Sequence, residues 1–345
     1  MELSQRRKAI LSAIVKLHIA SGEPIGSKIL CDILENAPSS ATLRNEMSAL
    51  CDMGFLSQPH TSAGRVPTAQ GYKLYVESLM NCDDVNPEHK QYIDSVLSPA
   101  NCDPEKMPDT ACKVLSEITG LPSLVANISA NGPKVKRVEL FKMGSRSVML
   151  ILITTDGRSR SRLVSIPTVF DNELVAKFDN LVRSRILKKS IEELSPVAQQ
   201  NIYIAAGMDA LPLMPLLSSL FDMISDINNT NVSMAGQTNL FTLGLGKEDA
   251  DKIISLLGRR DTLMSILADD VSSVGVIFGK DTVYSVLHPS SIIFAKYNAG
   301  EKNTGCVGVI GPTRMSYEQI IPSIEYTAKR MDSLLTATFK DMEEF

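Results

Sequence analysis

The chain has 345 residues, of which 44% are hydrophobic and 21% are charged, and its formal net charge is −4. A domain usually takes ~100 to 200 residues, so this length predicts two or three domains. The composition is that of a soluble protein, without the apolar run of ~18 residues that a membrane helix needs. We also see no secretion signal at the N-terminus and expect a cytoplasmic protein. The slightly acidic balance means that any affinity for nucleic acid is local.

The sequence offers no candidate catalytic, cofactor or metal site. The six cysteines are scattered, without a Cys-x-x-Cys pair or a histidine at ligand spacing. They therefore predict reduced thiols rather than a zinc site or a disulfide framework. No histidine has an acid or a nucleophile beside it in a catalytic pattern. We expect a protein that is not an enzyme.

Three short amphipathic helices are predicted at the start of the chain. Apolar residues recur at helical spacing in residues 4–19 and again in 27–34. A third helix, over 40–50, has Ser40 as its predicted N-cap and gathers its large apolar residues on one narrow stripe. Its opposite side is small and polar, which suits close approach to a polar partner.

A short hairpin and a fourth helix follow. Residues 55–58 have the pattern of a strand, 59–64 that of a turn, and 65–66 return along the first strand. Pro67 then opens another helix. The order helix, helix, helix, hairpin, helix over residues 1–80 is that of a winged helix-turn-helix domain.

The third helix and the hairpin carry side chains suited to duplex DNA. A guanidinium can grip guanine and an amide can grip adenine in the major groove, whereas hydroxyls and helix N-termini suit phosphate oxygens. We assign base contacts to Arg44 and Asn45 and phosphate contacts to Ser39, Ser40, Thr42, Thr61 and Ser62; the predicted DNA-binding set also includes Lys28, Ser48, His60 and Arg65. The alternative is an ordinary surface helix with a solvated polar side.

The rest of the chain is predicted to hold a linker, an α+β domain and an inserted module. Residues 81–108 are rich in Asn, Asp and Pro and read as a linker. Strand patterns, including an Asp-Gly hairpin signal, occupy 109–170 and return in 231–345, which predicts one α+β domain. Residues 171–230 are mostly helical in pattern and predict a helical module inserted into that domain.

The most basic stretch of the chain is residues 158–189. Arg158, Arg160 and Arg162 alternate there as they would on the exposed side of a strand. A solvated face is the preferred interpretation, and binding of an acidic partner or nucleic acid is the alternative.

Two stretches resemble a known family. The sequences SSATLRNEMSALCDMGFLSQPHTSAGRVPTAQGYKLYVESL, at 39–79, and GVIGPTRMSYEQII, at 308–321, are similar to the heat-inducible transcription repressor family HrcA. Weaker likeness extends over nearly the whole chain. The resemblance implies an N-terminal winged-helix domain, a GAF-like domain and a dimerisation module inserted in the latter.

The resemblance also implies a function. Members of the family repress chaperone operons of the groE and dnaK type by binding a CIRCE-like inverted-repeat operator as homodimers, and their activity depends on the GroE chaperonin. Carried over, residues 39–48 would be the recognition helix and 58–65 the wing. A two-fold dimer suits an inverted repeat because each copy reads one half-site. The alternative is a winged-helix regulator that senses a small ligand in the GAF-like pocket.

Overall fold

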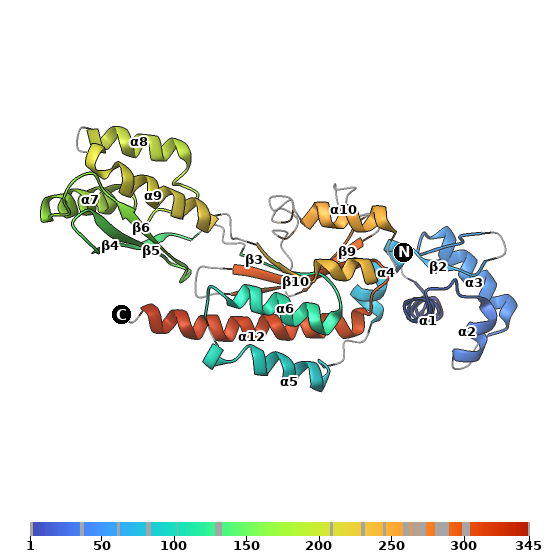
Figure 1. The fold of residues 1–345 in the computed structure, drawn as a ribbon. Helices are drawn as coiled ribbons and strands as arrows, with labels where there is room; N and C mark the ends of the chain where they lie inside the picture. Colours follow the sequence, from blue (N-terminus) through green and yellow to red (C-terminus); the bar gives the residue numbers. More distant parts are fainter. Residues whose placement is uncertain are drawn as a thin grey trace.

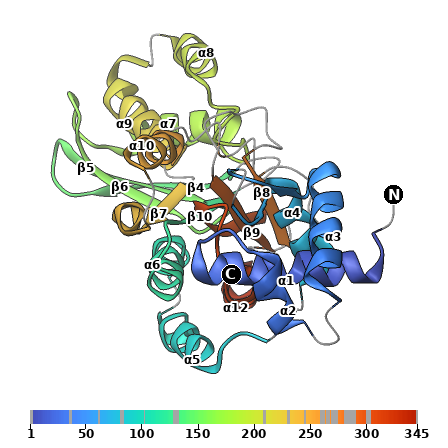
Figure 2. The same ribbon diagram turned by 90° about the vertical axis from the view of Figure 1, so that its right-hand side faces the viewer.

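The computed structural model shows a long molecule in three parts, with a winged-helix domain at one end, a sheet domain in the middle and a smaller α/β module at the other end (Figure 1). Figure 2 views the molecule from the end that carries the winged-helix domain. It describes residues 3–34, 38–60, 63–80, 84–101, 103–127, 133–207, 210–228, 232–243, 246–257, 263, 267, 274–279, 290–298 and 304–343. None of the helices in these ranges is long and apolar enough to cross a membrane.

The N-terminal part has the predicted order of elements. These are α1 (Gln5–Ser21), α2 (Ser27–Ile33), α3 (Ser40–Asp52), β1 (Leu56–Ser57), β2 (Val66–Pro67), α4 (Ala69–Leu74) and a π-helical turn (Tyr75–Leu79). The winged-helix prediction is confirmed. One cap differs from the prediction, because the side chain of Ser39, not Ser40, accepts the backbone N–H of Thr42.

The described residues of the predicted linker at 81–108 instead pack against the core. They contain α5 (Pro87–Val96) and a short 3-10 turn (Pro99–Asn101), and Ile93 is completely buried. The C-terminal helix α12 (Tyr317–Glu343) holds this segment through Arg330, whose Nε donates to the carbonyl of Leu97 at 2.9 Å. The helical pattern is weak in the sequence because few residues of α5 face the core.

The middle part is an antiparallel sheet between two layers of helices. Its described strands run in the order β7-β3-β10-β9-β8. Their bounds are β3 (Ser123–Asn127), β7 (Val232–Ala235), β8 (Val274–Phe278), β9 (Ser290–Asn298) and β10 (Thr304–Pro312). On one face lie α6 (Met107–Thr119) and α12, and on the other α10 (Lys247–Leu257), which follows a 3-10 turn (Gln237–Thr242). Successive residues of β9 pack into different cores, so this strand is apolar on both faces.

The inserted module is larger than predicted. The strands β4 (Val135–Lys142), β5 (Ser147–Thr154) and β6 (Ser159–Ser165) form a separate three-stranded antiparallel sheet. They share a core with α7 (Asn172–Arg185), α8 (Pro196–Ala206) and α9 (Ala210–Asn228). The boundary that we expected at 171 therefore shifts to about 133. The predicted Asp-Gly hairpin does join β5 to β6, with Gly157 at φ +79.

The three alternating arginines, Arg158 just before β6 and Arg160 and Arg162 within it, make ion pairs within the chain rather than a solvated basic face. Their partners are Asp156 for Arg158, Glu105 for Arg160, and Asp222 and Asp226 for Arg162. Arg158 is buried and also donates to the carbonyl of Ile227 at 2.7 Å. These contacts fasten β6 to α9 and to the chain before α6.

The winged-helix domain packs against the first turn of α12, and we call this contact the domain junction. The hydroxyl of the fully buried Tyr75 donates to Glu318 Oε1 at 2.7 Å, and Lys16 Nζ pairs with the same oxygen at 2.9 Å. Burial raises the pKa of Glu318, but the bonds from Lys16 and Tyr75 outweigh it, so the net shift is downward. The buried apolar residues of both domains form one continuous cluster.

Two aromatic rings and an imidazole complete the domain junction. The ring of Tyr72 lies 6.0 Å from that of Tyr317, and its hydroxyl is 2.7 Å from His18 Nδ1. Burial lowers the pKa of His18, the nearby Arg314 lowers it further, and Glu23 acts in the opposite direction. The docked arrangement therefore favours a neutral imidazole.

The domain junction should weaken in mild acid. The pKa of His18 is lower in the folded protein than its ordinary value of 6.5, so the unfolded chain binds the proton first. This contribution to stability is present above pH ~6.5 and is lost as the pH falls toward the folded-state pKa. We expect the urea midpoint of the wild type to fall between about pH 7.5 and pH 5.5, and to fall less in His18→Gln. The control is His60→Gln, on the exposed wing; an equal pH response in His18→Gln and the wild type would contradict the assignment.

Candidate nucleic-acid interface

Helix α3 presents a polar side to solvent. Its apolar stripe, Leu43, Met47 and Leu50, is buried against the rest of the winged-helix domain, as predicted. Glu46 pairs with Arg7 of α1 at 2.7 Å, which fixes the orientation of α3 on α1. The exposed side of α3 therefore carries Arg44, Asn45 and Ser48.

A buried serine outside the predicted set joins α2 to α3. The hydroxyl of Ser27, at the start of α2, lies 2.8 Å from Ser40 Oγ. Arg44 Nε donates to the same hydroxyl at 3.3 Å. Ser27 thus orients a guanidinium on the exposed side of α3. In the sequence it is visible only as the first residue of a predicted helix.

The described part of the wing is tied to the chain just before α2. Ile25 and Arg65 exchange two backbone hydrogen bonds, of 2.9 and 2.8 Å. A Cβ at Gly64 would lie 2.4 Å from the carbonyl oxygen of Ile25, so only glycine allows this approach. Gln58 Nε2 donates to the carbonyl of Ala63 at 3.1 Å across the base of the loop.

A polar groove of about 580 Å³ lies between α3, the start of α2 and the wing. We call it the DNA groove. Its lining residues are Gly26, Ser27, Arg44, Asn45, Met47, Ser48, Gln58, Ala63, Gly64 and Arg65. Among the residues that the structure describes, this lining includes two arginines and no carboxylate. Nε of Arg65 is buried and has no hydrogen-bond partner within the described part of the chain.

The structure brings some of the predicted residues together and leaves others apart. Arg44, Asn45, Ser48 and Arg65 line the DNA groove. Five other predicted residues do not line the groove. The hydroxyls of Ser39 and Thr42 form a hydrogen bond with each other at the start of α3, and that of Ser40 bonds to Ser27. Lys28 and His60 are exposed elsewhere on the domain. Thr61 and Ser62 lie outside the described residues.

Gln58 and Ser27 are lining residues that the prediction missed. Gln58 is exposed and directly follows the short strand β1, next to Pro59. Its side-chain amide offers the same donor and acceptor groups as that of Asn45. A polar residue at the end of a strand and beside a turn is the sequence feature that could have indicated Gln58 as a binding residue.

The described residues hold no group of three or more His, Cys, Asp or Glu side chains that could bind a metal ion. The cysteines for which the structure gives a state, Cys31, Cys51, Cys112 and Cys306, are free thiols.

Comparison with known proteins places the whole chain in one family. Residues 2–79 match the family described as winged helix-turn-helix transcription repressor, HrcA DNA-binding, and residues 105–321 match the HrcA protein C terminal domain. A protein named heat-inducible transcription repressor HrcA, from Clostridium botulinum (strain Alaska E43 / Type E3), is 30% identical over 343 residues, which cover 97% of this chain and 98% of that protein. A protein of the same name from Methylobacillus flagellatus is 28% identical over 339 residues, which cover 97% and 99% of the two chains.

A solved structure shares the fold. The crystal structure of a hypothetical protein superposes with a TM-score of 0.68 at 23% identity, and the match covers 98% of this chain and 100% of that chain. The match of both family models, over the winged-helix domain with its DNA groove and over most of the remaining chain, shows that this protein belongs to the HrcA family of winged helix-turn-helix transcription repressors.

Proposed function

We propose that this protein represses chaperone operons of the groE and dnaK type by binding a CIRCE-like inverted repeat in double-stranded DNA as a homodimer in the cytoplasm. The observation that carries the proposal is the DNA groove, where the exposed side of α3 and the wing form one concave surface whose described lining holds no carboxylate. Such a surface suits a polyanion although the whole chain has a net charge of −4.

The exposed side of α3 enters the major groove in this proposal. The major groove is wide enough for a helix, and each base pair presents a distinct pattern of donors and acceptors there. Arg44 suits guanine and Asn45 suits adenine. Ser27 orients the side chain of Arg44, because its hydroxyl accepts a hydrogen bond from Nε of the guanidinium at 3.3 Å. A guanidinium held in one orientation loses less side-chain entropy on binding than a free one.

The wing and the helix ends bind the phosphate backbone. A buried N–H without a partner costs about 1–3 kcal/mol, and a phosphate oxygen would supply the partner that Nε of Arg65 has not got among the described residues. The start of α3 offers the hydroxyls of Ser39, Ser40 and Thr42 together with its backbone N–H groups. Ser48 extends the same side of the helix, and Lys28, His60, Thr61 and Ser62 complete the proposed contact set.

Arg44→Ala should reduce operator affinity by about 1–3 kcal/mol and should relax the preference for one base pair, because a base contact carries sequence information. Lys28→Ala is the matched charge variant. It should weaken binding to all sequences alike. It should also reduce the slope of the logarithm of affinity against the logarithm of salt concentration by about 1, as expected for the loss of a phosphate contact. Fluorescence anisotropy on operator and scrambled duplexes at several salt concentrations separates the two. If Arg44→Ala weakened both duplexes equally, the base contact would be refuted.

The inserted module offers the surface for dimerisation. Phe141, Met149 and Leu163 stand side by side across β4, β5 and β6, on the face opposite to the helices, and the outer two are 48% and 60% exposed. On the helices, Val197 and Ile204 lie two turns apart in α8, both more than half exposed. Exposed apolar side chains of this kind mark a protein–protein contact. The two patches lie on opposite sides of the module, and we assign one of them to a second copy of the chain.

Charges placed on this module should separate the dimer. We expect Leu163→Glu or Ile204→Glu to change the mass in sedimentation equilibrium from twice 37.6 kDa to 37.6 kDa, because a buried unpaired carboxylate is costly. Glu173→Gln, at an exposed position of α7, is the control. A protein in which both charged variants remained dimeric would not use this module for dimerisation.

The GroE chaperonin completes the proposed mechanism as the sensor of heat. A protein only ~5–15 kcal/mol from unfolding has an active population that depends on its folding assistant. When other unfolded clients occupy the chaperonin, the active fraction falls and repression is lifted. We expect the fraction of protein that is competent for operator binding to rise as GroE is titrated in, and to fall again when an unfolded competitor is added. A fraction that is independent of GroE would refute this step.

A further inference from the structure

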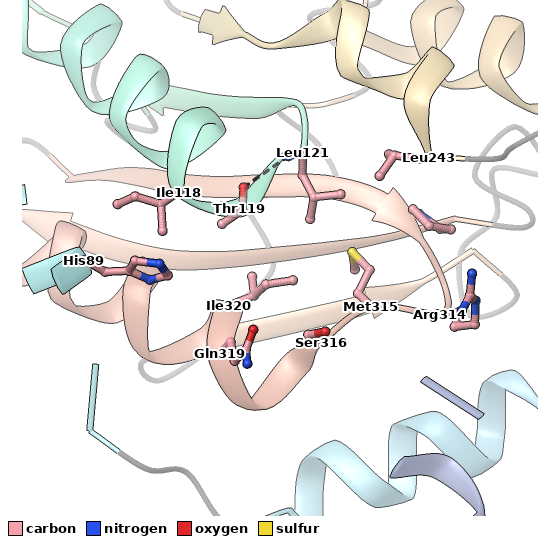
Figure 3. A pocket seen from close by; sticks show the side chains of 11 residues that line it. His89, Ile118, Thr119, Leu121, Leu243, Arg314, Met315, Ser316, Gln319 and Ile320 are labelled. Atoms are coloured by element: carbon pink, nitrogen blue, oxygen red, sulfur yellow. Dashed lines mark hydrogen bonds between the residues drawn. The ribbon is translucent and has the colours of Figure 1, made fainter. Parts of the chain in front are cut away.

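A small pocket lies beside the domain junction (Figure 3), and its described lining shares no residue with that of the DNA groove. It has a volume of about 220 Å³ and is built from the end of α6, the start of α12, the loop before it, α5 and Leu243. Leu121, Met315 and Ile320 are buried and give it an apolar floor. The remaining lining includes hydroxyl and amide groups. The pocket thus combines an apolar interior with polar groups, as small-molecule sites do.

The charge of the pocket favours an anion. Arg314 and His89 lie at opposite sides of it (Figure 3), and none of the described lining residues is a carboxylate. Among the described residues the only hydrogen bond of the Arg314 side chain goes to a backbone carbonyl, that of Ile19, and no ion pair neutralises the guanidinium. A guanidinium binds a carboxylate through two parallel hydrogen bonds, which are stronger than neutral ones.

The volume of the pocket and its apolar floor restrict the class of ligand further. Sites for drug-sized ligands have volumes of about 300–1,000 Å³, so this pocket suits a smaller molecule. An inorganic anion would leave the apolar floor in contact with a charged group, which is unfavourable. A carboxylate with a short apolar body matches both halves of the pocket, with the carboxylate on Arg314 and the body on Leu121 and Met315.

Arg314 also touches the DNA-binding part of the molecule. Its Nη1 donates to the carbonyl of Ile19 near the end of α1, at 3.2 Å. A Cβ at Gly22 would lie 3.0 Å from the same nitrogen, so the guanidinium rests against the C-cap of α1. Glu318, which holds Tyr75 and Lys16, follows Arg314 by four residues. One residue therefore belongs to both the pocket and the domain junction.

We propose that this pocket binds a small organic carboxylate and that Arg314 transmits its occupancy to the winged-helix domain. A carboxylate competes with the Ile19 carbonyl for the guanidinium, so the bound and free states differ in how the end of α1 is held. A ligand that interacts differently with two states shifts the balance between them, and the coupling is reciprocal. This role goes beyond the proposed repression and does not depend on the identity of the operator.

Calorimetric titration of the full chain with benzoate tests the site, with benzamide as the neutral ligand of the same shape. We expect benzoate to bind the wild type and Lys329→Gln, which removes an exposed charge elsewhere on α12. Arg314→Gln should weaken binding by about tenfold or more. Gln319→Trp, at the exposed rim, should block the pocket without touching the guanidinium. Equal binding of benzamide, full affinity in Arg314→Gln, or the absence of any benzoate binding overturns the site.

Hydrogen–deuterium exchange tests the coupling without DNA, so its outcome is independent of the proposed function. Benzoate should slow exchange in residues 312–321 and should speed exchange in residues 16–23 of the wild type, because Arg314 leaves the α1 carbonyl. The second effect should vanish in Arg314→Gln. If benzoate bound and residues 16–23 exchanged at an unchanged rate, the transmission through Arg314 would be overturned.

Discussion

The hydrogen bond between Tyr75 and Glu318 is the contact on which the arrangement of the molecule depends. It joins the last turn of the winged-helix domain to the first turn of α12, and Lys16 adds a charge to the same carboxylate. Around it the apolar residues of two domains merge into one cluster. A half-buried carboxylate stays charged only when hydrogen bonds and opposite charge offset its desolvation, and both are present here. The winged-helix domain thus shares its hydrophobic core with the central domain and is not packed as a separate unit.

The helices of the first domain could be predicted because their signals are local. A serine cap and an apolar stripe locate α3, and the same geometry places Arg44, Asn45 and Ser48 on its exposed side. The support beneath Arg44 could not be predicted in this way. Ser27 reaches it only because α2 folds back across α3, which the spacing of residues within one helix does not reveal.

Long-range contacts also explain the other differences. Helix α5 depends on α12, more than 200 positions later, through the bond between Leu97 and Arg330. Its own sequence carries too few apolar residues to indicate a core helix. The Asp-Gly turn predicts that β5 and β6 pair, but nothing in the hairpin indicates which of two sheets it joins. Placement of the module boundary required the partner helices.

The insertion of the module between β3 and β7 has a consequence for how the chain folds. These two strands are hydrogen-bonded neighbours, yet the whole module separates them in sequence, and the other neighbour of β3 is β10, later still. Pairing between such distant segments gives the topology a high contact order, which slows folding because a long loop must close before the contacts reward it. During synthesis the N-terminal domain leaves the ribosome long before the first turn of α12, against which it packs in the folded protein. For that interval β3 has an open edge and an uncovered apolar face, the type of surface that leads to aggregation.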